Sequence, residues 1–203
     1  MKTEKFTATN AAMLLIDHQV GTLSWCQNIP QELIRNNTRA LARSAKALDM
    51  PLILTSSMEE YAQGPLIKDL EEIAPEEHAR RVKRFGVVNA FDDPDYNSAV
   101  MATGRRNLIL AGLTNDVCIV YPAMSAVEEG FNVQVVVDAG GSPTQIADET
   151  ALRRMERAGV TLTSTNQLIA ELAASWTNEG GSKLIQILFE EVLVHLGKTS
   201  SET

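Results

Sequence analysis

The sequence lacks most of the features that mark membrane-bound, secreted or disulfide-stabilised proteins. Its 203 residues include only two cysteines, Cys26 and Cys118, and no apolar run approaches the roughly 20 residues that a membrane-spanning helix needs. The opening stretch MKTEKFTATN has no apolar segment of the kind found in signal peptides. We therefore expect a soluble, cytoplasmic protein with free thiols and no membrane partner.

Positive charge and potential metal ligands are also scarce. Eighteen Lys and Arg residues stand against 26 Asp and Glu residues, which gives a net charge of −8 at neutral pH. Such a surface repels phosphate backbones, so nucleic acid is not an expected partner. The three histidines, His18, His78 and His195, have no close ligand spacing, and no G-x-G-x-x-G loop is present. The sequence therefore predicts no metal and no other cofactor.

Short apolar runs of strand length alternate with helical patterns along most of the chain. The runs are nearly continuous, which is typical of parallel strands that are buried on both faces. They occupy residues 11–16, 51–55, 108–113, 133–139 and 160–164, with a weaker candidate at 79–84. This order predicts an α/β fold in which helices cover both faces of one parallel sheet through right-handed crossovers.

Capping residues mark the starts of two of the predicted helices. Asp93 followed by Pro94 predicts an N-cap and a first helical residue. The stretch SPTQ predicts Ser142 as an N-cap, Pro143 as the first helical residue and Gln145 as the partner in a capping box.

A change in composition near the C-terminus separates two parts of the chain. The stretch NEGGS at residues 178–182 predicts a flexible joint, and much of the helical pattern that follows is apolar. We therefore expect a main domain over residues 1–177 and a C-terminal linker and helix over 178–203. That helix packs either on its own domain or on a neighbouring subunit, because alone it would expose its apolar surface.

Three chemically distinct side chains follow three of the predicted strands. Asp17 ends the first, Arg84 or the adjacent Lys83 ends the weak third, and Cys118 follows the fourth. The carboxyl ends of parallel strands meet at one edge of a sheet, so an acid, a cation and a thiol can converge there. At the start of the next predicted helix, Cys118 would have a lowered pKa and backbone N–H groups suited to an oxyanion.

Each of these residues also has a simpler structural interpretation. A lone cysteine such as Cys118 is more often a small buried apolar residue, and Asp17 could serve only as a turn former. Side-chain alternation points His18 away from Asp17, which favours a structural or surface role. A ligand-binding domain without hydrolysis and a redox sensor based on Cys118 are alternative functions. A hydrolase needs Asp17 and a cation within hydrogen-bonding reach of the sulfur, whereas a sensor does not.

Three segments resemble a known family: LLIDHQVGTL, the basic residue before NAFDDPDY, and LAGLTNDVCIVYPAMSAVEEGFNVQVVVDAGG. Together they resemble the isochorismatase-like cysteine hydrolase superfamily, and within it the YcaC-like branch, over roughly residues 10–175. The resemblance implies a three-layer αβα sandwich with a central, mostly parallel sheet. It also implies a catalytic triad of Asp17, Arg84 and Cys118. Lys83 stays open as an alternative to Arg84, because most of the superfamily has lysine at this place.

The resemblance implies a mechanism and an assembly as well. Cys118 would attack the carbonyl of a small amide or related substrate and form a thioester, with Asp17 as the proton carrier. Leu113 and Thr114 would be joined by a cis peptide bond, and the N–H groups of Thr114 and Cys118 would hold the oxyanion. The branch forms higher homo-oligomers, so a tetramer or an octamer is expected.

The walls of the substrate pocket are the least determined part of the site. The sequence offers a mainly apolar set for them: Val20, Trp25, Phe85, Asn89 and Phe91. For each of these residues, ordinary core packing is a better explanation than contact with the substrate. The identity of the small-molecule substrate does not follow from them.

Overall fold

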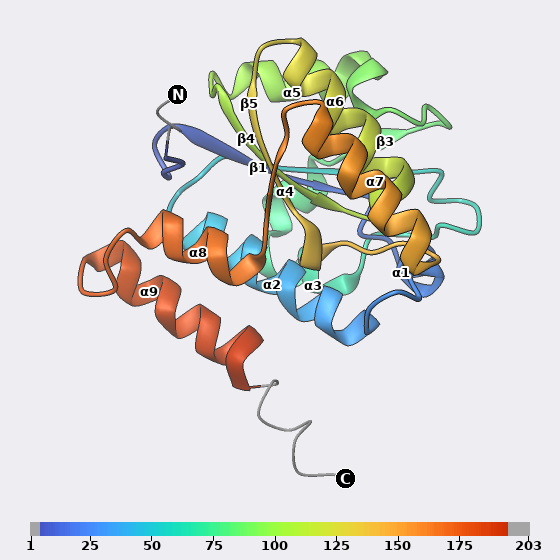
Figure 1. Ribbon diagram of the computed structural model, residues 1–203. Helices are drawn as coiled ribbons and strands as arrows, with labels where there is room; N and C mark the ends of the chain where they lie inside the picture. The colour runs from blue at the N-terminus through green and yellow to red at the C-terminus, as the bar shows by residue number, and fades with distance from the viewer. Residues whose placement is uncertain (1–4, 195–203) are drawn as a thin grey trace, which may run out of the picture.

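The computed structural model describes residues 5–194, and its architecture is the predicted α/β sandwich (Figure 1). The described residues form one six-stranded sheet in the order β3-β2-β1-β4-β5-β6. Every pairing between neighbours in this order is parallel. The strands are β1 (Ala11–Ile16), β2 (Leu52–Ser57), β3 (Val82–Arg84), β4 (Asn107–Gly112), β5 (Asn132–Val136) and β6 (Thr161–Thr163).

Helices cover both faces of this sheet (Figure 1). One face carries α2 (Gln31–Ala47), α3 (Lys68–Ile73) and α8 (Thr165–Ala173), and the other carries α5 (Pro94–Ala102), α6 (Val120–Glu128) and α7 (Gln145–Arg157). The short helices α1 (Val20–Trp25) and α4 (Pro75–Ala79) lie in the connections after β1 and β2.

The alternation of side chains along β1 explains the two layers of core. Met13 and Leu15 join the cluster under α2 and α8, whereas Leu14 and Ile16 join the cluster under α5 and α6. Successive side chains of a strand point to opposite faces, so a strand covered on both sides reads as an unbroken apolar run. This is why the strands were predictable from the sequence.

Several predicted boundaries differ from the structure: the strand predicted at 79–84 is formed only by Val82–Arg84, and the one predicted at 51–55 runs from Leu52 to Ser57. The apolar run at residues 133–139 is strand only as far as Val136, and Val137–Ala139 forms a 3-10 turn. The second helix start is wrong by two residues: Thr144 is the N-cap of α7, and the helix begins at Gln145. Ser142 does not cap, because its hydroxyl donates a hydrogen bond of 2.8 Å to Asp148 instead. Asp93 caps α5 as predicted.

The C-terminal segment continues directly from the main body of the chain. Asn178 is the N-cap of α9 (Glu179–Leu188), so NEGGS is a helix start in the structure rather than a flexible joint. Gly181 is required there, since a Cβ atom on it would lie 1.8 Å from the carbonyl oxygen of Ser175. The helix runs on through a π-helical turn, Phe189–Leu193. Figure 1 shows α9 beside α8, and Leu184 and Leu188 join the core under α2.

Ion pairs hold this C-terminal segment to α2 of the same chain. The Glu191 carboxylate is buried and accepts hydrogen bonds from the guanidinium groups of Arg39, at 2.7 Å, and Arg43. Arg39 also pairs with the buried Asp69 at 2.8 Å. The described part of the C-terminal helix therefore docks on its own domain. No helix among residues 5–194 is long and apolar enough to cross a membrane.

Candidate active site

The centre of the sheet brings together the ends of two strands that are far apart in the sequence. β1 and β4 are neighbours, and the chain leaves β1 toward β2 on one side and β4 toward β5 on the other. A reversal of this kind opens a crevice at the carboxyl ends of the two strands. Asp17 follows β1 at this point, and the turn with Cys118 follows β4.

Asp17 is held at the base of this crevice in a left-handed backbone conformation, with a φ of 56°. Its N–H donates a 3.0 Å hydrogen bond to the carbonyl of Thr55 on β2. The side chain is only 2% exposed. A carboxylate in such a position is costly unless charged or hydrogen-bonding partners compensate it.

Arg84 supplies that compensation from two strands away. Its Nη2 donates to Asp17 Oδ2, its Nε donates to the hydroxyl of Thr55 at 3.1 Å, and its Nη1 donates to the carbonyl of Val87 at 2.7 Å. The Arg84 side chain is fully buried. Lys83, in contrast, points out of the core and pairs with Glu59 at 3.1 Å. The cation that reaches Asp17 is therefore Arg84.

Two opposing influences act on the pKa of Asp17. Burial raises it above the ordinary value for aspartate; the positive charge and hydrogen bond of Arg84, and a hydrogen bond with the Cys118 thiol, act to lower it, with burial prevailing. Arg84 occupies only Oδ2. The other oxygen, Oδ1, is buried and receives no hydrogen bond from an N–H or O–H group of the described residues. Oδ1 is thus free to accept a proton.

Cys118 lies in an unusual turn between β4 and α6. The peptide bond between Leu113 and Thr114 is cis. Asn115–Ile119 forms a π-helical turn, and α6 begins only at Val120. Cys118 is therefore the fourth residue of the π-helical turn. The prediction that Cys118 stands at the start of the α-helix is wrong by two residues.

The pKa of the Cys118 thiol is raised rather than lowered. Burial is the main cause, and the Asp17 carboxylate beside the thiol adds to it. A hydrogen bond from the Thr114 backbone and the charge of Arg84 act in the opposite direction but do not prevail. The prediction of a lowered pKa is wrong, because it considered the helix and the cation but not burial and the neighbouring acid. The resting site contains a neutral thiol next to a carboxylate.

A network behind this turn fixes its position. Asn115 donates from Nδ2 to Asp148 at 2.9 Å, and the hydroxyl of Ser142 donates to the same carboxylate oxygen. The N–H of Asn115 donates to the carbonyl of Gly141 at 2.8 Å. A Cβ atom on Gly140 would lie 2.2 Å from Asn115 Oδ1, so glycine is needed for this close approach. The stretch DAGGS thus supports the cysteine turn, a role that the sequence analysis missed.

A cavity of about 290 Å³ opens over these groups. Asp17, Arg84, Thr114 and Cys118 line it. Further walls come from α1 and from the loops after β2 and β3, with Trp25, Met58 and Val87 among the apolar contributors. Thr22, Gln63 and Asp116 are lining residues with polar side chains that sequence reasoning did not find. Thr22 lies on α1, Gln63 lies in the loop after β2, and Asp116 lies in the π-helical turn, and no periodic pattern shows which of these side chains faces the cavity.

Of the five residues suggested for the pocket walls, only Trp25 lines this cavity. Phe85 is 82% exposed, since it follows Arg84 and therefore points to the opposite side. Phe91 is buried in the core, where its ring packs edge-on against another aromatic ring. Asn89 caps the N–H of Phe91 with its side chain. Val20 is half-exposed and lies outside the lining.

Neither of the histidines within residues 5–194, His18 and His78, lines the cavity. His18 is fully buried on the far side of Asp17, and its Nε2 donates to the carbonyl of Ala139 at 2.9 Å. Burial lowers the pKa of His18 to about 4, so its imidazole is neutral. His78 lies on α4, and His195 falls outside the described residues. His18 therefore has the structural role expected of it.

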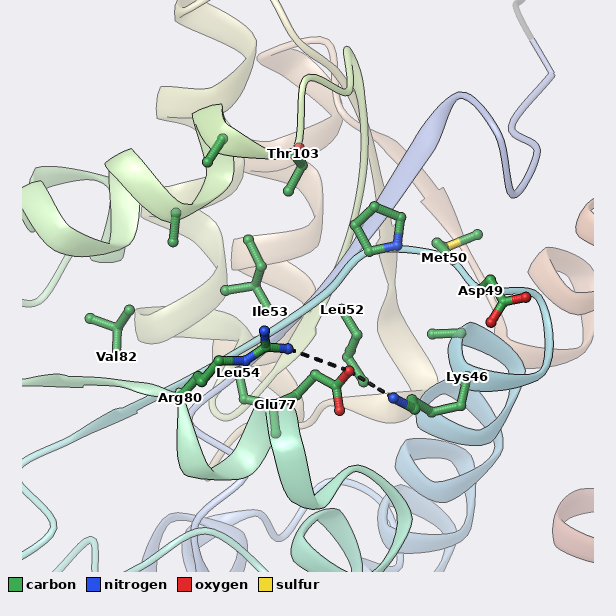
Figure 2. A pocket seen from close by; sticks show the side chains of 14 residues that line it. Lys46, Asp49, Met50, Leu52, Ile53, Leu54, Glu77, Arg80, Val82 and Thr103 are labelled. Carbon is green, nitrogen blue, oxygen red and sulfur yellow. Dashed lines mark hydrogen bonds and ion pairs between the residues drawn. The ribbon is translucent and has the colours of Figure 1, made fainter.

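A larger cavity, of about 580 Å³, lies at the opposite end of the strands (Figure 2). It is lined by the first residues of β2, from Leu52 to Leu54, and Glu77 links Lys46 and Arg80 across its floor. No cysteine, serine or histidine of residues 5–194 lines it. We therefore place the candidate active site in the smaller cavity, where an acid, a cation and a thiol meet.

Comparisons with known proteins agree with this architecture. The isochorismatase domain family matches residues 11–167. The Escherichia coli protein named "Probable hydrolase YcaC" is 41% identical over 170 residues, which cover 84% of this chain and 81% of the relative. Two solved structures, each 35% identical in sequence, are similar to this chain and cover 99% of it. The first is YcaC from Pseudomonas aeruginosa with hexane-2,5-diol and covalent acrylamide, with a TM-score of 0.91 over 98% of that chain. The second is E. coli YcaC, described as an octameric hydrolase of unknown specificity, with a TM-score of 0.89 over 97% of that chain.

The state of the thiol can be tested by alkylation of the native protein. We expect the rate at which iodoacetamide modifies Cys118 to keep rising from about pH 7 to about pH 9, because the pKa of a neutral, buried thiol lies above its usual range. Cys26 serves as the internal control. It is 1% exposed with a pKa raised to about 12, chiefly by burial, and should stay unmodified. Mass spectrometry of the separated peptides measures both rates, and a plateau for Cys118 below neutral pH would show a thiolate instead.

Proposed function

The chain belongs to the isochorismatase family of hydrolases, and on this basis we propose that it cleaves a small amide or related carbonyl compound through a thioester on Cys118. Asp17 is the proton carrier, and Arg84 is the cation that holds it. The observation that carries the proposal is the Asp17 carboxylate, which contacts the Arg84 guanidinium through one oxygen and leaves the other free beside the Cys118 thiol.

The first half of the reaction forms the thioester. The sulfur of Cys118 bonds to the substrate carbonyl carbon while the thiol proton passes to Asp17 Oδ1. The carbonyl oxygen becomes an oxyanion, and the backbone N–H groups of Thr114 and Cys118 are the donors suited to stabilise it. When the tetrahedral intermediate collapses, the carbon–nitrogen bond breaks, and the proton on Asp17 moves to the departing amine or ammonia.

The second half releases the acid product. Asp17 takes a proton from a water molecule as the water oxygen bonds to the thioester carbon. The carbon–sulfur bond then breaks, and the proton returns from Asp17 to the sulfur. One water molecule is consumed, and a carboxylic acid and an amine are produced. A carboxylate suits both proton transfers because burial brings the pKa of Asp17 upward, toward the working pH.

Arg84 acts by position and charge rather than by proton transfer. A guanidinium keeps its proton under all ordinary conditions. Its three hydrogen bonds to Thr55, Val87 and Asp17 orient the carboxylate and balance its charge in the absence of water. This arrangement also speaks against a redox sensor, which needs a reactive thiolate and has no use for a buried acid–cation pair beside the sulfur.

Substitutions in the triad test the proposal. Against a substrate found by screening amides and esters, Asp17→Asn and Cys118→Ala should each lower kcat/KM by at least about a hundredfold, and the double variant should be no worse, because the two residues act as one unit. Arg84→Lys should retain part of the activity, since it keeps the charge, whereas Arg84→Ala should not.

Lys83→Ala is the matched control, because it removes a neighbouring cation that pairs with Glu59 outside the site. It should keep the wild-type kcat/KM. Circular dichroism must show that each inactive variant is folded. A folded Asp17→Asn variant with the wild-type rate would overturn the assigned mechanism, and an inactive Lys83→Ala variant would move the cation to that residue.

We also propose that the protein assembles into a homo-oligomer, either a tetramer or an octamer. Exposed apolar side chains lie on this part of the surface: Trp25, Val88 and Val117 line the cavity and are between 40% and 55% exposed, and Phe85, outside the lining, is 82% exposed. A surface of this kind is typical of a subunit contact. The E. coli relative is described as octameric. The expected cytoplasmic location stays a prediction.

Light scattering coupled to size-exclusion chromatography measures the assembly directly. The expected mass is four or eight times that of the 22.2 kDa chain. Phe85→Ser, which places a polar group on the most exposed of these side chains, should weaken the assembly without unfolding the subunit. A monomeric wild-type protein at micromolar concentration would contradict the proposal.

A further inference from the structure

The charged groups that line the active-site cavity are few. Among residues 5–194, the lining contains three formally charged side chains, Asp17, Arg84 and Asp116, and no lysine or histidine. Cys118 is neutral at rest, because the pKa of its thiol is raised. The balance of these groups therefore determines which charge on a substrate the cavity can accept.

Arg84 is not available to bind an anionic substrate. Its guanidinium donates to Asp17, Thr55 and Val87 from all three of its nitrogens, and its side chain has no exposed surface. Its charge is balanced by the Asp17 carboxylate. A substrate carboxylate or phosphate would have to compete with this buried pair.

Asp116 is the charge that the cavity leaves uncompensated. It stands two residues before Cys118 in the same π-helical turn, and it lines the cavity. Its Oδ1 is buried and has no hydrogen-bond partner within residues 5–194, and none of the ion pairs found there includes it. The cation on the adjoining surface, Arg154, stacks over the ring of Tyr121 at 5.2 Å.

A second polar group in the cavity also lacks a partner. Thr22, on α1, is 3% exposed and lines the same cavity. Its hydroxyl oxygen is buried without a hydrogen bond to any described residue. Buried polar atoms are nearly always paired, so Asp116 Oδ1 and Thr22 Oγ1, which join Asp17 Oδ1 as unpaired atoms of this lining, point to polar partners on a bound molecule.

We propose that Asp116 is a specificity-determining residue, which makes this site select neutral or positively charged substrates and exclude anionic ones. The substrate class is a small amide that carries a hydrogen-bond donor, such as an amino, ammonium or amide N–H group, for the Asp116 carboxylate. The hydroxyl of Thr22 binds a further polar atom of the same molecule. This inference rests on the proposed function, since it takes Cys118 as the group that the substrate must reach.

Paired thiol reagents test the charge selection without a known substrate. Three methanethiosulfonates of similar size are compared on the native protein: the neutral methyl, the cationic 2-aminoethyl and the anionic 2-sulfonatoethyl reagent. Each rate at Cys118 is divided by the rate of the same reagent with a small free thiol. We expect the corrected rate of the cationic reagent to exceed that of the anionic one by about tenfold, because an unscreened carboxylate near the sulfur repels the sulfonate.

Asp116→Asn isolates the carboxylate in question. The amide is nearly isosteric, and Asp116 Oδ1 has no hydrogen bond within the described residues to lose. This variant should bring the cationic and anionic rates to within about threefold of each other. Glu60→Gln is the matched control: it removes the same charge from an exposed residue that does not line the cavity. It should leave the ratio at the wild-type value.

The outcomes separate this inference from the proposed function. If the neutral reagent fails to modify Cys118, the proposed nucleophile is inaccessible and the function itself is in error. If it modifies Cys118 but the wild-type ratio is near one, or Asp116→Asn leaves the ratio unchanged, the charge selection is overturned while the proposed function stands. A ratio that shifts equally in Glu60→Gln also overturns it, because the effect would then belong to the overall charge.

Discussion

The structure depends on one buried ion pair that crosses the sheet. Arg84 at the end of β3 reaches over β2 to Asp17 at the end of β1, and both side chains are almost fully buried. Burying two charges costs more than their attraction returns unless the remaining donors and acceptors are satisfied. The Thr55 hydroxyl and the Val87 carbonyl accept hydrogen bonds from the other two nitrogens of the guanidinium. The pair therefore links the ends of β3 and β1 across β2 at the place where the cavity forms.

The same pair determines the chemistry of the thiol. Burial raises the pKa of the adjacent Cys118 thiol, and the Asp17 carboxylate, which Arg84 binds through only one oxygen, raises it further. The site is thus arranged for a thiol that loses its proton during attack rather than for a standing thiolate. Such an arrangement protects the sulfur from oxidants at rest, since oxidation follows thiolate character. The proposed exclusion of anionic substrates follows from the same balance of charge, since Arg84 is paired with Asp17 and Asp116 has no ion-pair partner within residues 5–194.

Much of this could be predicted from the sequence, for reasons that lie in the sheet. Strands covered on both faces give unbroken apolar runs, and the carboxyl ends of parallel strands converge, so Asp17 and Cys118 could be placed together. Short-range patterns were less reliable. Ser142 was predicted to be a helix cap, but its hydroxyl donates a hydrogen bond to Asp148 on α7. NEGGS was predicted to be a flexible joint, but it starts α9, because Gly181 allows a close approach of the backbone. The cavity walls depend on loop conformation, which no periodicity encodes, so Phe85 was assigned to them and Asp116 was not.

The central claim is that Cys118 becomes covalently acylated during turnover. The most direct measurement is the intact mass of the protein after brief incubation with a panel of activated neutral acyl donors, followed by acid quenching and mapping of the modified peptide. The account predicts a mass increase equal to one acyl group, located on Cys118, that disappears as the thioester hydrolyses and is absent from Cys118→Ala. An acyl group on any other residue, or turnover of a donor with Cys118→Ala at the wild-type rate, would contradict it.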